Sequence, residues 1–282
     1  IDLHAPLLER FSAGYDDVIS AALETARAPD RLFLPLTATE ALLEALRILS
    51  DAMARGADEM APLVVEHRVM EILLQLLQFL TIPVSEMFRD PSHFLAIRQE
   101  VVPLLKTYPS LKIWIAGCST GEEVYSMAIL LREEGLLERA IIYATDINPS
   151  SLEKAKQGIF SMDSIPGYNT NYLKAGGKRQ FSDYYTAAYD YAIFDKTLRE
   201  NVTFADHSLA TDSVFSETQL ISCRNVLIYF NKKLQDRAFG LFHDSLCHRG
   251  FLVLGSKETL DFSGYKDQFE PLVKQERIYR KS

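Results

Sequence analysis

Long hydrophobic runs are missing from this sequence. The longest, such as residues 72–77, is interrupted by a glutamine and is too short to cross a bilayer. The sequence also does not open with a positively charged segment followed by an apolar stretch and a small-residue cleavage site. We therefore expect no membrane insertion and no secretory signal peptide, and we expect a cytoplasmic protein.

Cysteine is scarce. The three cysteines, Cys118, Cys223 and Cys247, are odd in number and lie in apolar surroundings, which favours reduced thiols over a disulfide framework. The six histidines and three cysteines form no pair at the spacing of metal ligands. We therefore expect no structural metal.

An excess of basic residues is also lacking. The formal net charge is −8, and residues 1–66 hold 12 acidic residues against five arginines and no lysine. Nucleic acid is disfavoured as a partner because phosphates require a basic surface. Residues 67–282 have a formal net charge of only −1, so a local basic strip on this part of the chain is still compatible with the sequence.

The common nucleotide-binding motifs are absent. An apolar segment, residues 113–116, runs into Gly117 and Gly121, and this spacing fits neither the dinucleotide motif G-x-G-x-x-G nor the phosphate loop. Glycine at both positions lets backbone approach a ligand. Glu122 and Glu123 place negative charge at the following helix start, where a phosphate would need none. A cationic ligand such as S-adenosylmethionine suits this turn better, although Glu122 could simply complement the helix dipole.

The order of predicted elements indicates two domains. Residues 1–82 show only helical patterns, including a capping box at 37–40 and an apolar stripe over 65–80. From residue 83 strands alternate with helices, which predicts a doubly wound α/β domain with a parallel sheet over 83–282. The expected helices and strands are 91–105, 111–116, 122–134, 140–145, 149–157, 202–205, 219–223, 232–246, 251–255 and 276–280.

Two segments depart from this alternation. Residues 160–198 are rich in Tyr, Gly and Asp with little helical periodicity, and we interpret them as an insertion that forms a small antiparallel sheet. The last two predicted strands are joined through residues 256–275 and suggest an antiparallel edge of the main sheet. We expect Asp90 and Pro91 to cap the first helix of the domain.

Polar residues follow the predicted central strands, where ligands of such sheets bind. Asp146 lies 25 residues after Gly121, roughly where an acidic residue of nucleoside-binding folds accepts hydrogen bonds from a ribose diol. Its alternative role is to cap the next helix, but Asn148 before Pro149 already occupies the cap position. Arg224 and Asn225 interrupt an apolar run. Arg224 could be a paired core arginine, whereas in a functional interpretation Asn225 and Tyr229 face the ligand cleft.

Five segments together resemble the CheR family of chemoreceptor glutamate methyltransferases. They are residues 85–90, 116–126, 144–148, 153–160 and 223–230, in the family's order and at similar spacing, within a resemblance that covers about residues 70–282. The resemblance implies a class I, Rossmann-like S-adenosylmethionine-dependent methyltransferase domain with an inserted small β subdomain and an N-terminal all-α domain. It implies methyl transfer to receptor glutamates in chemotaxis adaptation, with S-adenosylhomocysteine as the product.

The resemblance also implies site residues. Arg89 and Tyr229 match residues beside the reacting methyl group. The implied cofactor contacts are Ser85, Arg89, Gly117, Glu123, Asp146, Ser208, Leu209, Asn225 and Val226. Ser85 stands where the family usually has threonine, and Pro83 and Ser208 stand where some members have asparagine.

The acidic residues 1–66 also depart from the family, whose members carry an arginine-rich helix that faces an acidic receptor. We expect a monomer whose partner is a chemoreceptor cytoplasmic domain or a related signalling protein. Two alternatives remain: a methyltransferase with another substrate, and a non-catalytic module that binds S-adenosylmethionine or S-adenosylhomocysteine as a signal.

Overall fold

The chain divides into two units, residues 1–82 and 83–282. A computed structural model describes residues 85–282, so the helices expected within residues 1–82, and Pro83, lie outside the described residues. Within the described range no helix is both long and apolar enough to span a bilayer.

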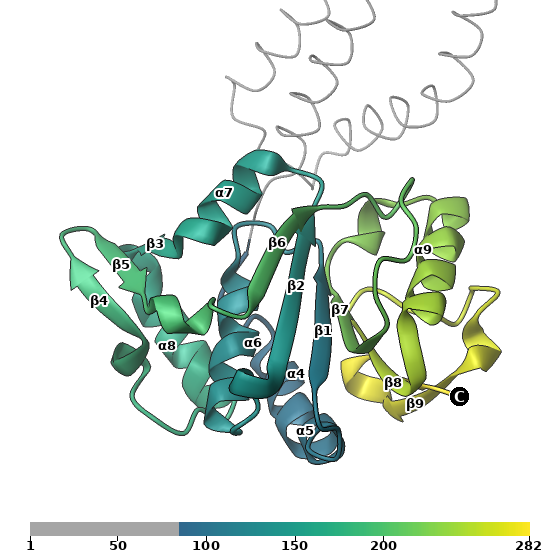
Figure 1. The fold of residues 1–282 in the computed structure, drawn as a ribbon, viewed down its shortest axis with the longest axis horizontal. Helices are drawn as coiled ribbons and strands as arrows, with labels where there is room; N and C mark the ends of the chain where they lie inside the picture. Colours follow the sequence, from purple (N-terminus) through teal and green to yellow (C-terminus); the bar gives the residue numbers. More distant parts are fainter. Residues whose placement is uncertain (1–84) are drawn as a thin grey trace, which may run out of the picture. The chain divides into compact units, whose positions relative to one another are not determined.

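The described residues form a mixed seven-stranded sheet with helices on both faces (Figure 1). The strand order is β6-β2-β1-β7-β8-β10-β9, and the first five of these strands run parallel to one another. The seven strands are β1 (Leu111–Ala116), β2 (Ala140–Asp146), β6 (Val202–Asp206), β7 (Thr218–Cys223), β8 (Leu246–Leu254), β9 (Phe269–Val273) and β10 (Ile278–Lys281). The antiparallel edge is made by β10 against β8 and by β9 against β10.

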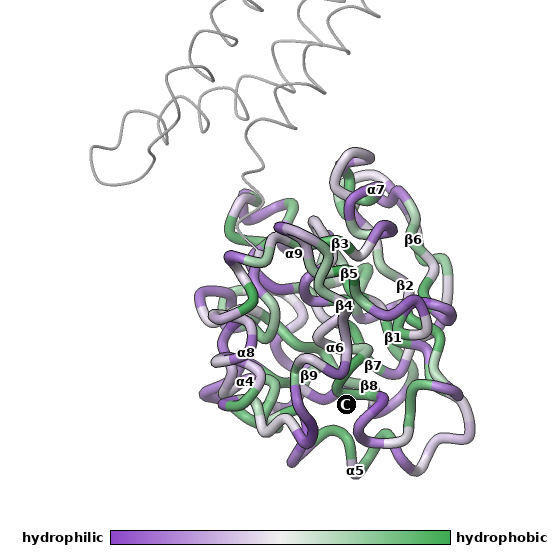
Figure 2. Tube along the Cα trace, turned by 90° about the vertical axis from the view of Figure 1, so that its left-hand side faces the viewer, coloured by the Kyte–Doolittle hydropathy of each residue, from purple (hydrophilic) through white to green (hydrophobic). Residues whose placement is uncertain are grey.

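Alternate residues of β1 feed two separate cores. Ile113 and Ile115 belong to a core with the helices α4 (Pro91–Ala96), α5 (Val102–Leu105) and α6 (Glu122–Glu133). Trp114 and Ala116 belong to a second core with α9 (Lys232–Ser245) on the opposite face. Figure 2 shows hydrophobic segments along the central strands β1, β7 and β8. This arrangement is the doubly wound α/β fold that the sequence predicts.

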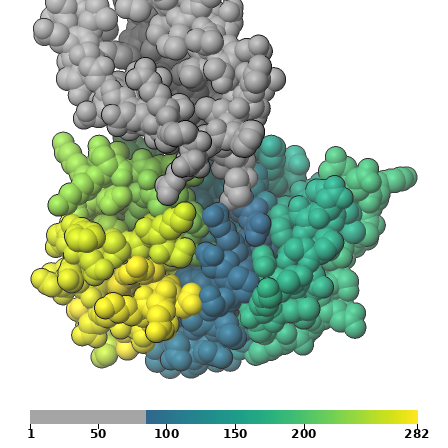
Figure 3. Space-filling model, turned by 180° about the vertical axis from the view of Figure 1, so that it is seen from behind, coloured from purple at the N-terminus to yellow at the C-terminus, as the bar shows by residue number. Residues whose placement is uncertain are grey.

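The segment before β1 differs from the single helix expected over 91–105. Residues Ile97–Val101 form a turn of π-helix between α4 and α5. Pro91 stands in the first turn of α4 as expected, but Asp90 makes no capping hydrogen bond there. Its carboxylate instead pairs with Arg224 at 2.8 Å, so the expectation that Asp90 caps this helix was wrong. Figure 3 shows this segment lying between the C-terminal strands and residues of the 150–190 region.

Residues 159–194 contain a second, three-stranded antiparallel sheet in the order β3-β5-β4. Its strands are β3 (Ile159–Ser161), β4 (Tyr185–Ala188) and β5 (Tyr191–Phe194), and it follows α7 (Pro149–Gln157). The segment also holds a helix that we did not predict, α8 (Ile165–Lys174). Its buried residues Ile165, Tyr168 and Tyr172 lie three and four residues apart, a helical signal that the Gly-, Tyr- and Asp-rich composition obscured.

A buried ion network joins this second sheet's segment to the main domain. The carboxylate of Glu133, at the end of α6, accepts hydrogen bonds from Arg98, from the backbone of Lys178 and from the hydroxyls of Tyr172 and Tyr184. The Glu133 side chain is fully buried. Because three of these donors lie between α8 and the turn before β4, Glu133 fixes this part of the chain against α6.

Candidate functional site at the carboxyl edge of the sheet

The predicted site residues gather at one edge of the main sheet. Gly117 follows β1, Asp146 ends β2 and Asn225 lies two residues after β7, and these three strands are parallel neighbours. Their carboxyl ends therefore meet at the same edge, which is where such sheets bind ligands.

The glycine turn after β1 is packed closely by its neighbours. Gly117 has φ +76° and donates its N–H to the carbonyl of Thr145 at 2.8 Å. A Cβ at Gly117 would lie 2.3 Å from Cγ2 of Val226, and a Cβ at Gly121 would lie 2.8 Å from Cβ of Ala155. Close packing therefore leaves no room for a side chain at either glycine, and Val226 lies directly against the turn.

Asp146 is fixed by backbone donors from two loops. Its carboxylate accepts from the N–H of Ser119 at 2.7 Å and from that of Asn148 at 2.9 Å. Asn148 caps α7 by accepting from the N–H groups of Ser150 and Ser151, as the sequence predicts. Burial raises the pKa of Asp146, and the hydrogen bonds from these N–H groups oppose that rise. Each carboxylate oxygen keeps a second lone pair, so Asp146 can still accept hydrogen bonds from a diol.

Arg224, which is buried, pairs with the half-buried Glu123 beneath this edge. Glu123, in the first turn of α6, accepts from the hydroxyl of Ser222 and lies 3.4 Å from the Nη1 of Arg224. The Arg224 side chain is 2% exposed and also packs over the ring of Phe94. Arg224 is therefore a paired core arginine, as the sequence indicates.

Arg224 also holds the turn that carries Arg89. Its Nη2 donates to the main-chain carbonyl of Arg89 and to the carboxylate of Asp90, each at 2.8 Å. The backbone of this turn is strained, because Phe88 and Asp90 have φ values of 51° and 56°. The main chain of Arg89 is thereby held next to the ends of β7 and α6.

Residues 225–229 form the turn that follows β7. Asn225 has φ 60°, and Tyr229 donates its backbone N–H to the carbonyl of Val226 at 3.2 Å. The Tyr229 side chain is 69% exposed. The phenol therefore reaches solvent from a turn whose base lies against Gly117.

The remaining predicted residues lie around this edge. Ser208 and Leu209 follow β6, the strand beside β2. The backbone N–H of Ser208 donates to Asp212 at 2.9 Å, and the Leu209 side chain is buried in the core beside α9. Ser85 lies at the start of the Arg89 turn, three residues before Phe88, whose N–H donates to the hydroxyl of Ser126.

Glu258 is a further residue of this site that the sequence does not predict. It lies in the polar segment after β8 and reads as a surface residue, yet it is only 4% exposed. Its carboxylate accepts hydrogen bonds from the backbone of residues 225–227, so it belongs to the structure of this site. The one local feature of the sequence that could have pointed to Glu258 is Gly255, three residues earlier, which follows a buried strand.

The hydrogen-bond acceptors at this edge fit S-adenosylmethionine. The carboxylates of Glu123 and Asp146 could accept hydrogen bonds from an ammonium group and a ribose, and the glycine turn lies between the end of β1 and the start of α6. Negative charge along this edge complements a cationic cofactor and opposes a phosphate.

Comparisons with known proteins agree with this chemistry. The family model described as the CheR methyltransferase, SAM binding domain, matches residues 83–278. A Pseudomonas putida protein named "Putative methyltransferase Cher3" is 78% identical over 211 residues, covering 75% of this chain and 77% of that relative. A "Chemotaxis protein methyltransferase" of Listeria innocua is 31% identical over 191 residues, covering 67% of this chain and 70% of that relative. The solved N-methyltransferase NodS from Bradyrhizobium japonicum is 13% identical and covers 61% of this chain and 63% of its own, and its TM-score of 0.35 is too low to bear on the fold.

Proposed function

This chain belongs to the CheR methyltransferase family, and from that premise we propose that it methylates glutamate side chains of chemoreceptor proteins. It is an S-adenosylmethionine-dependent methyltransferase of the CheR type. The proposed products are a glutamate methyl ester on the receptor and S-adenosylhomocysteine. The proposed partner is the cytoplasmic part of a chemoreceptor or of a related signalling protein.

One observation carries the proposal. Arg224 ties the main chain of Arg89 to Glu123, so the turn bearing Arg89 is built into the same edge as the proposed cofactor contacts. An arginine beside a methyl-transfer site suits a carboxylate acceptor, because its planar fork of donors matches a carboxylate.

The chemistry asks little of the protein beyond alignment. When bound, S-adenosylmethionine supplies an electrophilic methyl group on a positively charged sulfur. A glutamate carboxylate, with a reference pKa of about 4.3, is already ionised at neutral pH and needs no general base. We assign two tasks to this chain: it orients the acceptor and it excludes water. Orientation brings the attacking oxygen to roughly 3–3.5 Å from the methyl carbon.

Separate roles follow for the two proposed catalytic residues. Arg89 holds one carboxylate oxygen of the acceptor and leaves the other to attack. Tyr229, on the turn after β7, donates a hydrogen bond or packs beside the reacting methyl group. The proposed cofactor contacts are Ser85, Arg89, Gly117, Glu123, Asp146, Ser208, Leu209, Asn225 and Val226.

The test is incubation of the protein with methyl-labelled cofactor and receptor cytoplasmic fragments. We expect label on the fragments that is released by mild base, because carboxyl methyl esters are base-labile. Label on a small molecule, or base-stable label on protein, would indicate a different acceptor. Tight cofactor binding without any transfer would indicate the non-catalytic signalling module.

A further inference from the structure

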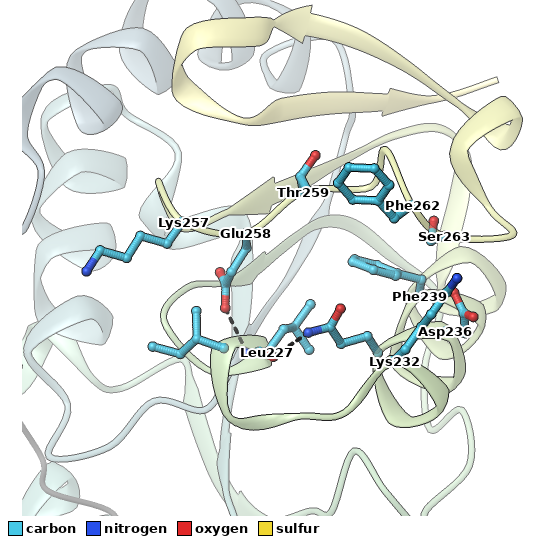
Figure 4. Close-up of a pocket in the computed structure, with 11 residues that line it drawn as sticks. Leu227, Lys232, Asp236, Phe239, Lys257, Glu258, Thr259, Phe262 and Ser263 are labelled. Atoms are coloured by element: carbon cyan, nitrogen blue, oxygen red, sulfur yellow. Dashed lines mark hydrogen bonds between the residues drawn. The ribbon is translucent and has the colours of Figure 1, made fainter. Parts of the chain in front are cut away.

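Glu258 is a buried carboxylate that serves as the common acceptor for four backbone N–H groups. Its Oε1 accepts from Val226 at 2.9 Å and Leu227 at 2.7 Å. Its Oε2 accepts from Asn225 at 3.1 Å and Gly255 at 2.7 Å. Figure 4 shows the carboxylate pointing from the segment after β8 toward the turn at Leu227. Burial raises the pKa of Glu258, and the four N–H groups oppose that rise.

The three consecutive N–H groups converge because of the backbone of the turn. Asn225 is in the left-handed region with φ 60°, and Val226 follows with φ −112° and ψ −49°. Successive N–H groups in such a turn point into one concave space that binds an anion. Here the chain fills this space with its own carboxylate, which satisfies donors that would otherwise be buried without partners.

This turn supports the proposed reaction site on two sides. Cγ2 of Val226 occupies the space that a Cβ of residue 117 would need. The turn after β7 and the turn after β1 are therefore in contact. Tyr229 is attached to the same turn through its N–H bond to the carbonyl of Val226. Gln235 of α9 adds donors to the carbonyls of Leu227 and Phe230. A shift of this turn would therefore move Asn225, Val226 and Tyr229 together.

We propose that Glu258 is a positioning residue, whose carboxylate acts as an internal anion that holds residues 225–229 in the geometry needed for cofactor binding and methyl transfer. This inference rests on the proposed roles of Asn225, Val226 and Tyr229. Glutamine cannot replace the carboxylate, because its amide offers one acceptor oxygen and turns a donor toward the remaining N–H groups. Aspartate keeps the charge on a side chain one methylene shorter.

The experiment uses Glu258→Gln, with Asp261→Asn as the matched control, because Asp261 is an exposed carboxylate of the same segment. We measure S-adenosylhomocysteine affinity by calorimetry, and hydrogen exchange of residues 224–230 in the full chain. We expect Glu258→Gln to weaken binding at least tenfold and to speed exchange at residues 225–227 at least tenfold. Glu258→Asp recovers part of both losses, and Asp261→Asn changes neither.

A second variant covers the case in which Glu258→Gln does not fold. A Cβ at Gly255 would lie 2.8 Å from Oε2 of Glu258 and 2.8 Å from the N of Asn225, so Gly255→Ala displaces the carboxylate while retaining it. We expect the same losses from this variant. Wild-type affinity in a folded Glu258→Gln or Gly255→Ala variant whose residues 225–227 exchange faster would overturn the inference. If the wild-type protein binds S-adenosylhomocysteine but methylates no receptor fragment, the proposed acceptor is wrong, and the affinity ratios still decide the role of Glu258.

Discussion

The guanidinium of Arg224 donates to the main-chain carbonyl of Arg89 across 135 positions of sequence. The same guanidinium pairs with Asp90 and Glu123, so one buried cation joins the turn before α4, the first turn of α6 and the end of β7. Three segments that a sequence keeps apart are thus brought to one edge by a single side chain.

Removing that cation should destabilise the domain. Arg224→Met keeps most of the apolar volume but leaves Glu123 and Asp90 without their shared partner. We expect a loss of about 2 kcal/mol in the free energy of unfolding, since Glu123 and Asp90 lose their partner and the main-chain carbonyl of Arg89 loses its donor. Urea denaturation measures this loss, and Arg237→Met, at an exposed arginine, is the control expected to stay within about 0.5 kcal/mol. A variant as stable as the wild type would show that the pair does not hold these segments together.

Arg89→Ala should abolish most turnover while the domain still binds cofactor. The reason is that Arg89 is proposed to orient the acceptor carboxylate, and loss of one such donor costs about 10²–10³-fold in rate. Single-turnover transfer to receptor fragments gives the rate, and calorimetry with S-adenosylhomocysteine gives the affinity. Arg89→Lys retains the charge without the planar fork and should recover only part of the rate. Near-normal transfer by Arg89→Ala would remove Arg89 from the reacting centre.

The sequence predicted local features better than distant pairings. The bounds of α7 agree with prediction, because Asn148 and Pro149 carry the cap and the first turn within the helix itself. In contrast, β8 begins at Leu246 rather than Phe251, since Leu246 pairs with Thr218 on another strand. Strand β9 was missed because Pro271 breaks its pattern, and this proline is tolerated at the edge of the sheet.

The same contrast between local features and distant pairings holds for the site residues. Gly117, Asp146 and Asn225 were predictable because each follows an apolar strand, and topology alone brings the carboxyl ends of parallel strands together. Glu258 was not predictable, because nothing in its polar surroundings shows that its carboxylate turns inward to the backbone of residues 225–227. Asp90 was misassigned because Asp before Pro favours a helix cap locally, while its actual partner, Arg224, lies 134 positions away.

Asp146→Ala should weaken cofactor binding. A carboxylate that accepts hydrogen bonds from a ribose contributes about 1.5–3 kcal/mol, which corresponds to a loss of roughly 10–100-fold in affinity. Calorimetry with S-adenosylhomocysteine measures it. Asp206→Ala is the matched control, because Asp206 ends the neighbouring strand β6 directly opposite Asp146 and is exposed. Equal affinity of wild type and Asp146→Ala would take Asp146 out of the ribose site.

Glu134 should make the stability of the domain depend on pH in the acid range. Burial raises the pKa of Glu134, but hydrogen bonds from Lys178, Lys106 and Arg98 outweigh it and lower the pKa to about 2. The folded state therefore binds this proton more weakly than the unfolded state, whose pKa is close to 4.5. The stabilisation is fully present above pH 4.5 and is lost as the pH falls toward 2, with an upper limit of about 3 kcal/mol.

Glu134→Gln tests this dependence, because the amide cannot ionise. We expect the variant to be less stable than the wild type at pH 7, and the difference between them to shrink steadily as the pH is lowered from 4.5 toward 2. Urea denaturation at a series of pH values gives both curves. Glu138→Gln, at an exposed position just beyond α6, should run parallel to the wild type throughout. A gap between wild type and Glu134→Gln that stays constant across this range would mean that the ion pairs of Glu134 with Arg98, Lys106 and Lys178 do not set its ionisation, because a packing effect of the substitution alone carries no pH dependence.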